Sequence, residues 1–194
     1  MNYYPAFLNL KGKRVLLFGA GKVALRKARA LIKSEADLVV ISRDFSRSFL
    51  RFAERNQIKI QHGSTLPEFL NGVSLVIAAT SDREFNREVA GQCAVQGIFV
   101  NVVDDPEHST FIVPSLLKRG PLQIAISTGG ASPLLAKMLR QKLARHLGAQ
   151  YGRLAERLGR ERKRIRHAID FEKERRDQIK KLTLSRLKNF ESKS

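Results

Sequence analysis

Short apolar runs alternate with amphipathic stretches over the first half of the chain. The runs have the composition of buried strands and fall at residues 14–18, 38–41, 58–60, 75–79 and 99–103. Between them, apolar residues recur at helical spacings of three and four in segments 23–33, 45–53 and 83–96. Strands that alternate with helices in this way predict an α/β fold, with a Rossmann-type parallel sheet covered on both faces.

The pattern changes after residue 104. Two apolar segments on either side of a Lys-Arg-Gly-Pro turn predict an antiparallel hairpin, with strands at 111–117 and 122–127 and the turn at 118–121. Ser132 and Pro133 are the N-cap and first residue of a predicted helix that ends at Gly148. The rest of the chain predicts further helices, whose apolar stripe is too sparse for a core of its own. We therefore expect three parts, at residues 1–113, 114–148 and 149–194.

The chain is strongly basic, with 36 Lys and Arg against 18 Asp and Glu and a formal net charge of +18. The positive electrostatic field of such a protein attracts polyanions, whether nucleic acid, an anionic membrane or a multiply charged small substrate. Part of the basic excess is also accounted for by an ordinary solvated surface. No apolar run approaches the ~20 residues that span a bilayer. The first residues lack a secretory signal pattern. The only cysteine, Cys93, is expected to be a buried, inert thiol. Together these features predict a cytoplasmic protein without a disulfide.

The segment GAGKVA at 19–24 is a G-x-G-x-x-A fingerprint between a predicted strand and a predicted helix. Gly19 permits the tight turn, and Gly21 lets the backbone approach a pyrophosphate at the helix N-terminus. Small Ala24 lets the helix pack close to the strand. The segment predicts a dinucleotide site, with the candidate residues Gly19, Gly21, Lys22 and Val23.

Two further positions follow strands that end at the same edge of the sheet. After the second strand, Asp44 is suited to bind a ribose hydroxyl, whereas Arg43 is suited to stack on adenine or to face a 2′-phosphate. The residues alone do not choose between NAD and NADP. After the fourth strand, Thr80 either contacts the cofactor or belongs to the N-cap of the next helix, with Ser81 and Asp82.

An acidic segment follows the fifth strand. Asp104 stands at the strand end, where a carboxylate that faces the nicotinamide can accept a proton from a substrate. An alternative of equal weight is a solvated loop in which Asp104 and Asp105 precede a Pro turn. These acids and His108 have no second His or Cys at the spacing of a closed metal site, so we predict no bound metal.

A polar, Gly-rich loop leads into the helix that begins at Pro133. Backbone N–H groups of such a loop can cradle carboxylates or phosphates, and the candidate substrate-binding residues are Ser127, Thr128, Gly129 and Gly130. The alternative is a helix cap and turn, and the two interpretations are compatible.

Taken together, these motifs resemble the precorrin-2 dehydrogenase/sirohydrochlorin ferrochelatase family of siroheme synthesis, the siroheme synthase N-terminal type. The resemblance covers about residues 4–147. It is carried by Tyr4-Pro5, GAGKVA, Arg26-Lys27, Ala79-Thr80, Asn86, NVVD at 101–104, FIVP at 111–114 and STGGASP at 127–133.

The resemblance implies a homodimer with an NAD-binding domain, a dimerisation domain and a C-terminal helical domain. It implies NAD-dependent oxidation of precorrin-2 to sirohydrochlorin and, in some members, insertion of ferrous iron, which is then a substrate. The family's general base falls on Asp104. A polycarboxylate tetrapyrrole suits the basic charge of the chain, and no nucleic-acid or membrane partner is expected.

Two other classes of protein fit parts of the sequence. One is a non-catalytic module that senses NAD(H) and binds nucleic acid through the basic tail. The other is a structural dimer with a degenerate nucleotide fold. The dehydrogenase accounts for more of the motifs than either.

Overall fold

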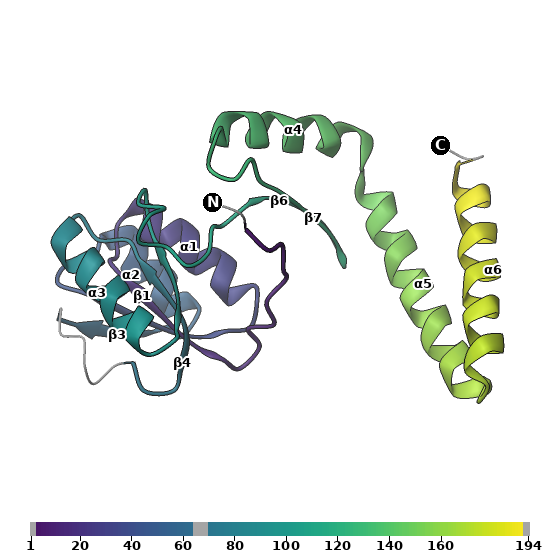
Figure 1. Cartoon of the computed structure of the whole chain (residues 1–194), viewed down its shortest axis with the longest axis horizontal. Helices are drawn as coiled ribbons and strands as arrows, with labels where there is room; N and C mark the ends of the chain where they lie inside the picture. Colours follow the sequence, from purple (N-terminus) through teal and green to yellow (C-terminus); the bar gives the residue numbers. More distant parts are fainter. Residues whose placement is uncertain (1–2, 64–69, 192–194) are drawn as a thin grey trace. The chain divides into compact units, whose positions relative to one another are not determined.

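The computed structural model describes residues 3–63 and 70–191, and the chain divides into two compact units, residues 1–113 and 114–194 (Figure 1). None of the described helices is both long and apolar enough to cross a membrane. The elements of the first unit are, in order, β1 (Arg14–Phe18), α1 (Lys22–Ile32), β2 (Asp37–Ser42), α2 (Arg47–Arg55), β3 (Lys59–His62), β4 (Val73–Ala78), α3 (Arg83–Val95) and β5 (Phe99–Val102). Those of the second are β6 (Ser115–Arg119), β7 (Leu122–Ile126), α4 (Pro133–His146), α5 (Ala149–Ala168) and α6 (Glu172–Glu191).

The strands of the first unit form a parallel sheet in the order β3-β2-β1-β4-β5. Strand β1 is central, and its Leu16 pairs with Val39 of β2 on one side and Val76 of β4 on the other. This arrangement confirms the predicted Rossmann-type α/β fold. Because the strands are parallel, the ends of β1, β2, β4 and β5 meet at one edge, where ligands of open α/β sheets bind.

Each face of the sheet carries its own core. Successive side chains of a strand point to opposite faces, so Val15 and Leu17 lie in one cluster and Leu16 and Phe18 in the other. The first cluster also contains the buried side of α1 and α2, and the second the buried side of α3. Burial on both faces explains why β1 and β4 are continuous apolar runs.

The chain turns back along β5 before it leaves the first unit. The backbone N–H of Thr110 donates to the carbonyl of Val100 over 2.8 Å, and the Thr110 hydroxyl accepts from the Val100 N–H over 2.8 Å. The carbonyl of Phe111 accepts from the side-chain amide of Asn101 over 3.1 Å. These contacts hold residues 110–111 beside β5. The predicted hairpin strand 111–117 is therefore wrong at its start, and β6 begins only at Ser115.

The antiparallel hairpin of the second unit is confirmed, but its turn is tighter than predicted. Arg119 pairs with Leu122, so the turn consists of Gly120 and Pro121 rather than residues 118–121. Gly120 has a φ of +56°, a conformation that glycine adopts without strain. The first strand consequently extends two residues further into the predicted turn.

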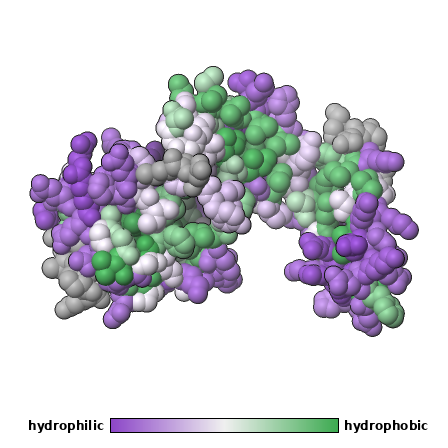
Figure 2. Space-filling view, viewed as in Figure 1, coloured by the Kyte–Doolittle hydropathy of each residue, from purple (hydrophilic) through white to green (hydrophobic). Residues whose placement is uncertain are grey.

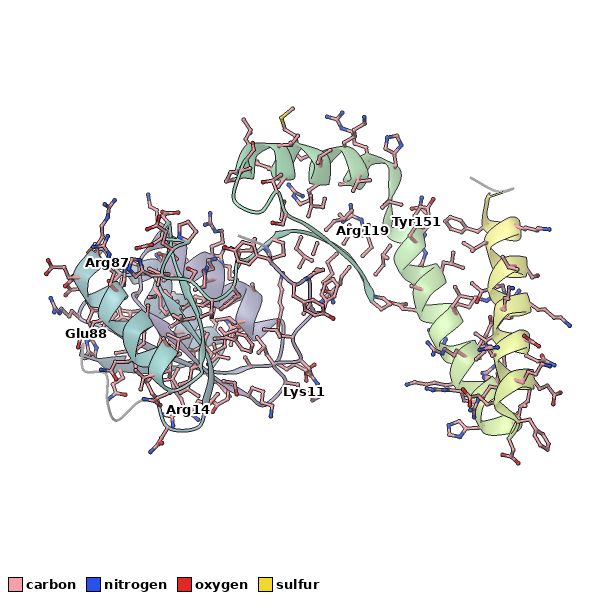
Figure 3. All side chains as sticks on the ribbon, viewed as in Figure 1. Lys11, Arg14, Arg87, Glu88, Arg119 and Tyr151 are labelled. Carbon is pink, nitrogen blue, oxygen red and sulfur yellow. The ribbon has the colours of Figure 1, made fainter. Side chains whose placement is uncertain are left out.

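The helix after the hairpin begins and ends where it is predicted to, with Leu147 as its C-cap, but Gly148 has a different role. Ser132 accepts a hydrogen bond from the N–H of Leu135 over 3.2 Å, and Pro133 opens α4. At the other end, the Arg119 Nε donates to the carbonyl of Leu147 over 3.0 Å, which satisfies part of the helix terminus (Figure 3). Gly148 is the N-cap of α5, with a φ of −76°, so it begins the next helix and is not a left-handed stop.

The last two helices pack against each other through an aromatic pair and an ionic group. The ring centroids of Tyr151 and Phe190 are 4.8 Å apart. Glu161 accepts from Arg157 over 3.2 Å and from Arg186 over 2.8 Å, and the hydrogen bond from Arg186 is the main reason that its pKa is lowered. The helices predicted after residue 149 are thus confirmed as α5 and α6. The division of the second unit at residue 148 stays a prediction.

Candidate functional site

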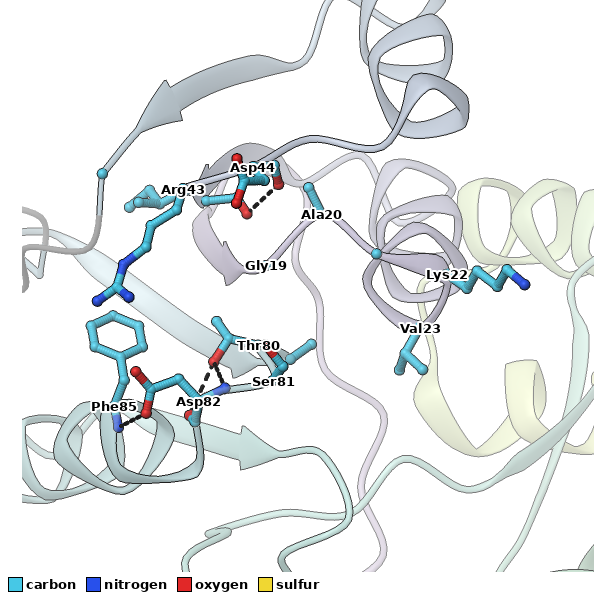
Figure 4. Close-up of a pocket in the computed structure, with 15 residues that line it drawn as sticks. Gly19, Ala20, Lys22, Val23, Arg43, Asp44, Thr80, Ser81, Asp82 and Phe85 are labelled. Atoms are coloured by element: carbon cyan, nitrogen blue, oxygen red, sulfur yellow. Dashed lines mark hydrogen bonds between the residues drawn. The ribbon is translucent and has the colours of Figure 1, made fainter.

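A pocket of about 600 Å³ lies at the ends of β1, β2 and β4 (Figure 4). It gathers all of the residues that the sequence assigns to a dinucleotide site, namely Gly19, Gly21, Lys22, Val23, Arg43, Asp44 and Thr80. It also includes Gly63 and Phe85, for which the sequence offered no signal. The connections after three separate strands therefore converge on one cavity of the first unit.

The two glycines of the fingerprint have different physical roles. Gly19 has a φ of +100°, and a Cβ there would be 2.5 Å from the carbonyl oxygen of Ala79 at the end of β4. Any side chain at Gly19 would thus push β4 away from β1. A Cβ at Gly21 would meet nothing within 4 Å, so this position faces open space. Of the two, only Gly21 leaves room for a ligand to approach the backbone.

The N-terminus of α1 suits an anion. Gly21 is its N-cap and offers no side chain to the first N–H groups, and the first turn contains no acidic residue. Those N–H groups and the positive end of the helix dipole are available to a ligand. Figure 4 shows the side chain of Lys22 directed away from Arg43 and Thr80. A pyrophosphate at Gly21 and the backbone of Lys22 and Val23 fits these features.

Arg43 and Asp44 follow β2 and are both exposed. The hydroxyl of Ser42 donates to the backbone carbonyl of Asp44 over 2.7 Å, which fixes the turn after the strand. Figure 4 shows the Arg43 guanidinium extending towards Phe85 and away from Asp44. Within the described residues, neither side chain forms an ion pair. A carboxylate and a guanidinium therefore both remain available to the ribose end of a dinucleotide.

The two interpretations of Thr80 and its neighbours are compatible in the structure. Asp82 is the N-cap of α3 and accepts from the N–H of Phe85 over 3.0 Å. Thr80 lines the pocket, but its hydroxyl donates to the buried Asn86 over 2.7 Å. Its contribution to a ligand is therefore restricted to its backbone and methyl group unless that hydrogen bond is exchanged.

Asp104 lies in a backbone conformation that is uncommon for a residue with a side chain. Its φ is +59°, in the left-handed region that Asp tolerates better than most residues. Ser109 holds the surrounding turn, because its hydroxyl accepts from the N–H of Val102 over 2.9 Å and donates to the carbonyl of Asp105 over 2.8 Å. These two hydrogen bonds hold the turn in which the exposed Asp104 lies.

The neighbouring carboxylate has different partners. Asp105 accepts from the His108 Nδ1 over 2.8 Å and lies 3.6 Å from the Arg87 Nε. The hydrogen bond from His108 is the main reason that the pKa of Asp105 is lowered. No hydrogen bond or ion pair to the Asp104 carboxylate is found in residues 3–63 and 70–191. Of the two adjacent acids, Asp105 stabilises the loop and Asp104 remains available for chemistry.

A half-buried lysine that contacts β5 was not assigned a role from the sequence. The Nζ of Lys27 in α1 donates to the Oδ1 of Asn101 in β5 over 3.3 Å. The two residues are 74 positions apart, so no local pattern links them. From the sequence, Lys27 was noted only because the pair Arg26-Lys27 is part of the family resemblance.

The Gly-rich loop of the second unit is stabilised by its own hydroxyl groups. Thr128 accepts from the N–H of Ser132 over 2.9 Å, and Ser127 accepts from the N–H of Gly129 over 3.0 Å. Gly129 and Gly130 have φ values of +63° and +93°, and a Cβ at either would meet nothing within 4 Å. The loop is a cap and turn with open backbone at its two glycines.

The thiol of the chain lies outside these sites. Cys93 is fully buried in α3, and burial raises its pKa to about 11. The predicted burial of this thiol is thereby confirmed, and a raised pKa disfavours the thiolate, which is the reactive form. Over the described ranges, no group of three or more His, Cys, Asp or Glu residues is arranged to hold a metal ion.

Two family models match the chain. Residues 6–115 match the model described as putative NAD(P)-binding, and residues 119–146 match the model described as sirohaem biosynthesis protein central. The first match covers the whole parallel sheet and its pocket. The second covers most of the hairpin and α4.

Curated relatives and a solved structure agree with the two family models. The siroheme synthase of Chromobacterium violaceum is 43% identical over 155 residues, which are 80% of this chain and 33% of that protein. Siroheme synthase 2 of Aeromonas hydrophila is 42% identical over 176 residues, 91% of this chain and 37% of that protein. The chain thus spans about a third of the length of these relatives. The solved structure of SirC, precorrin-2 dehydrogenase, superposes on this chain with a TM-score of 0.76 and 24% sequence identity. The superposition covers 98% of this chain and 100% of the SirC chain.

Proposed function

The chain belongs to the siroheme synthase N-terminal family, whose first domain is described as putative NAD(P)-binding, and on this basis we propose that it oxidises precorrin-2 to sirohydrochlorin with NAD. The relatives are named siroheme synthases, and a protein of the same fold is named precorrin-2 dehydrogenase. The proposal assigns the cofactor to the pocket at the sheet edge and proton removal to Asp104.

The position of Asp104 is the observation that carries the proposal. β5 pairs with β4, and Val102 is the partner of Ala78. Asp104 follows Val102 by two residues, just as Thr80, a residue of the pocket, follows Ala78. Parallel strands bring equivalent positions to the same edge, so the acid belongs to the edge that holds the nucleotide site.

The residues of the first unit supply binding, orientation and a base. Backbone N–H groups at the start of α1 bind the pyrophosphate, and Asp44 accepts from a ribose hydroxyl. When bound, NAD accepts the hydride that leaves the substrate. Asp104 accepts the proton that leaves with it, so that the tetrapyrrole loses two hydrogens in total. Asp104 is free for this step because, among the described residues, its carboxylate has no hydrogen bond or ion pair, whereas Asp105 binds His108 and Arg87.

The basic charge of the chain supports a polycarboxylate substrate. A net charge of +18 raises the local concentration of an anionic tetrapyrrole even though each exposed ion pair contributes little. In the second unit, the open backbone of Ser127, Thr128, Gly129 and Gly130 is the proposed binding site for substrate carboxylates. Ferrous iron enters the proposal only as a substrate for insertion, with Asp104 accepting the pyrrole protons.

The proposal also includes a homodimer. Large apolar side chains of the second unit are exposed in the single chain, and Figure 2 shows apolar residues gathered over α4 and the hairpin. They are Leu116, Leu134, Leu135, Met138 and Leu139. A patch of this kind is typical of a protein–protein interface, and the dimerisation domain implied by the family falls on the same residues.

Replacement of Asp104 by asparagine tests the function. Asn tolerates the left-handed conformation as well as Asp does, whereas Ala adds strain, so D104N removes the base with little change in the fold. We expect kcat for sirohydrochlorin formation to fall about 10²- to 10⁴-fold, the usual effect of losing a general base. The measurement is an anaerobic assay of precorrin-2 with NAD, followed at the absorbance of sirohydrochlorin and repeated with ferrous iron.

The matched control is Asp105→Asn, one residue away. That variant loses the partner of His108 and Arg87, and we expect a loss of less than about tenfold, because the carboxylate stabilises the loop and takes no proton. NAD affinity, measured by calorimetry, should be unchanged in both variants. Near-normal turnover by a folded, NAD-binding D104N protein would remove Asp104 from the mechanism. Absence of turnover by the unmodified protein would contradict the proposed function as a whole.

A further inference from the structure

Helix α5 carries an excess of positive charge that its neighbour α6 does not share. It contains seven Lys or Arg residues against two Glu, whereas α6 contains seven basic and four acidic residues. A solvated helix is usually stabilised by a mixture of both signs, because opposite charges three or four positions apart attract each other. Solvation alone therefore does not explain the charge of α5.

Four arginines of α5 lie on one face of the helix and form an arginine stripe. They are Arg153, Arg157, Arg160 and Arg164, at successive spacings of four, three and four residues. These spacings place side chains one above the other on a helix. At a rise of 1.5 Å per residue, the stripe is about 17 Å long. All four residues are exposed.

The arginine stripe is poorly neutralised by carboxylates. Arg157 donates to Glu161 over 3.2 Å, but the same carboxylate also accepts from Arg186 of α6 over 2.8 Å. Within the described residues, the side chains of the other three arginines of the stripe form no ion pair or hydrogen bond. Like charges at these spacings repel one another along a helix. An anion bound across the stripe would offset that repulsion.

The helix that presents the arginine stripe is packed against the β6–β7 hairpin. A Cβ at Gly152 would lie 2.6 Å from the carbonyl oxygen of Arg119, so the backbone of α5 approaches the hairpin closely at this glycine. Glu156 reaches the same turn, because its Oε1 would be 2.9 Å from a Cβ on Gly120. The packed helix thus holds the stripe in place while its arginines stay exposed.

The chemistry of the stripe favours the phosphates of a linear polyanion. A guanidinium presents a planar pair of N–H donors that matches two phosphate oxygens. One strand of a nucleic-acid duplex carries a phosphate every 3.4 Å along the axis, so a stripe of about 17 Å laid along it passes about five phosphates. The carboxylates of a tetrapyrrole surround a ring and do not form such a row.

A lipid surface fits α5 less well than a duplex does. Helices that bind membranes lay an exposed apolar face into the interface. The large apolar residues of α5 are half-buried instead, and the helix packs against α6. They are Leu154, Leu158 and Ile165.

We propose that the arginine stripe of α5 binds the phosphate backbone of a nucleic-acid duplex without reading its sequence. Phosphate contacts supply affinity that is independent of sequence and falls steeply with salt. The family resemblance implies no such partner, so the proposal depends on the residues of α5 alone. It is separate from the proposed oxidation of precorrin-2, and the failure of either leaves the other standing.

The test compares two double variants of the full chain that remove the same charge. The stripe variant, Arg160→Gln with Arg164→Gln, neutralises part of the stripe. The α2 variant, Arg51→Gln with Arg55→Gln, neutralises two exposed arginines at the same spacing in the first unit. The probe is a fluorescein-labelled DNA duplex of about 20 base pairs in two unrelated sequences, and Kd is measured by fluorescence anisotropy between about 50 and 200 mM NaCl. Circular dichroism and calorimetry of NAD binding check the fold.

We expect the unmodified protein to bind both duplex sequences alike, with log K falling against log salt at a slope of about −3 to −4. The stripe variant loses two phosphate contacts, so its slope should be shallower by about two and its affinity at about 50 mM NaCl at least about tenfold weaker. The α2 variant should keep the slope and change Kd by less than about twofold, because only the stripe contacts the duplex.

Two results of the duplex titrations would overturn the proposal. One is the absence of binding by the unmodified protein at about 50 mM NaCl. The other is an equal loss of affinity in both double variants, because it would show a diffuse effect of net charge.

A third arm of the experiment uses uroporphyrin, a polycarboxylate tetrapyrrole, as the ligand in place of the duplex. We expect its affinity to be the same in the stripe variant as in the unmodified protein. If uroporphyrin binds more tightly than the duplex and loses affinity in the stripe variant, the stripe holds carboxylates of a small substrate, and its assignment to nucleic acid is wrong.

Discussion

At the scale of single residues, the turn after β2 presents two side chains that favour different dinucleotides. Asp44 is suited to the free 2′-hydroxyl of NAD, and Arg43 to the 2′-phosphate of NADP. We expect a higher kcat/KM for NAD, and a fall of about tenfold or more in the NAD:NADP ratio for Asp44→Ala, the effect of one charge-assisted hydrogen bond. Steady-state kinetics with both dinucleotides measures this ratio.

Arg43→Leu is the companion variant for that measurement. If the Arg43 guanidinium only stacks on the adenine, its loss should lower kcat/KM for NAD and for NADP by the same factor. A strong preference of the unmodified protein for NADP, abolished by Arg43→Leu, would instead show that the guanidinium selects the cofactor and that Asp44 does not.

Residues with local signals were predictable, and residues with distant partners were not. Gly19 and Gly21 were found because the fingerprint fixes a turn between a strand and a helix. The place of Asp104 at the sheet edge was predictable because it follows a strand end, although its left-handed backbone gave no sign in the sequence, and its catalytic role stays a prediction. The contact between Lys27 and Asn101 was not predictable, because Asn101 comes from a distant strand and pairing of side chains across a fold leaves no periodicity.

At the scale of elements, a substitution at the start of α1 should weaken NAD binding without lowering the stability of the fold. Gly21 is an extended N-cap that faces open space. An aspartate is a preferred N-cap residue, so Gly21→Asp should keep or slightly raise Tm, while its carboxylate occupies and repels the pyrophosphate site. We expect calorimetry to show an NAD affinity at least about 100-fold weaker, and thermal unfolding without NAD to show no loss of stability.

Gly91→Asp is the matched control for this variant. Gly91 is an exposed glycine of α3, and a Cβ added there would meet nothing within 4 Å, so the change adds the same charge away from the pocket. It should leave NAD affinity unaltered. Undiminished NAD binding by Gly21→Asp would show that the dinucleotide does not lie on α1.

The type of each element followed from periodicity, but several ends did not. The hairpin was predicted from alternation, yet residues 110–111 bind along β5 and delay β6 to Ser115. The end of α4 falls at Leu147 as predicted, but Gly148 starts α5 and the Arg119 side chain binds carbonyls at the end of α4. Both hairpin and helix end thus make contacts with distant segments that periodicity does not reveal.

At the scale of the whole molecule, the apolar patch on α4 leads to a prediction about assembly. Met138 is 57% exposed in the single chain. If it lies in a dimer interface, Met138→Glu places a charge there and should raise the dimer Kd by about 100-fold or more. Sedimentation velocity at micromolar concentration should show a dimer for the unmodified protein and a monomer for the variant.

Lys137→Glu, on the same helix, is the control for charge. It alters an exposed polar position next to the patch, and the dimer should persist. A monomeric unmodified protein, or a Met138→Glu protein that remains dimeric, would contradict the assignment of α4 to the interface. The thermal unfolding of the first unit provides a check that neither variant affects the fold of the sheet.

The left-handed backbone at Asp104 has a consequence for how this protein tolerates change. Glycine adopts a φ of +59° without strain, so Asp104→Gly relieves a cost of about 1 kcal/mol while it removes the proposed base. Under the proposed function, engineering guided by thermostability alone would accept glycine at this position and produce a more stable but inactive protein. Stability and the proposed activity therefore oppose each other at this one backbone angle.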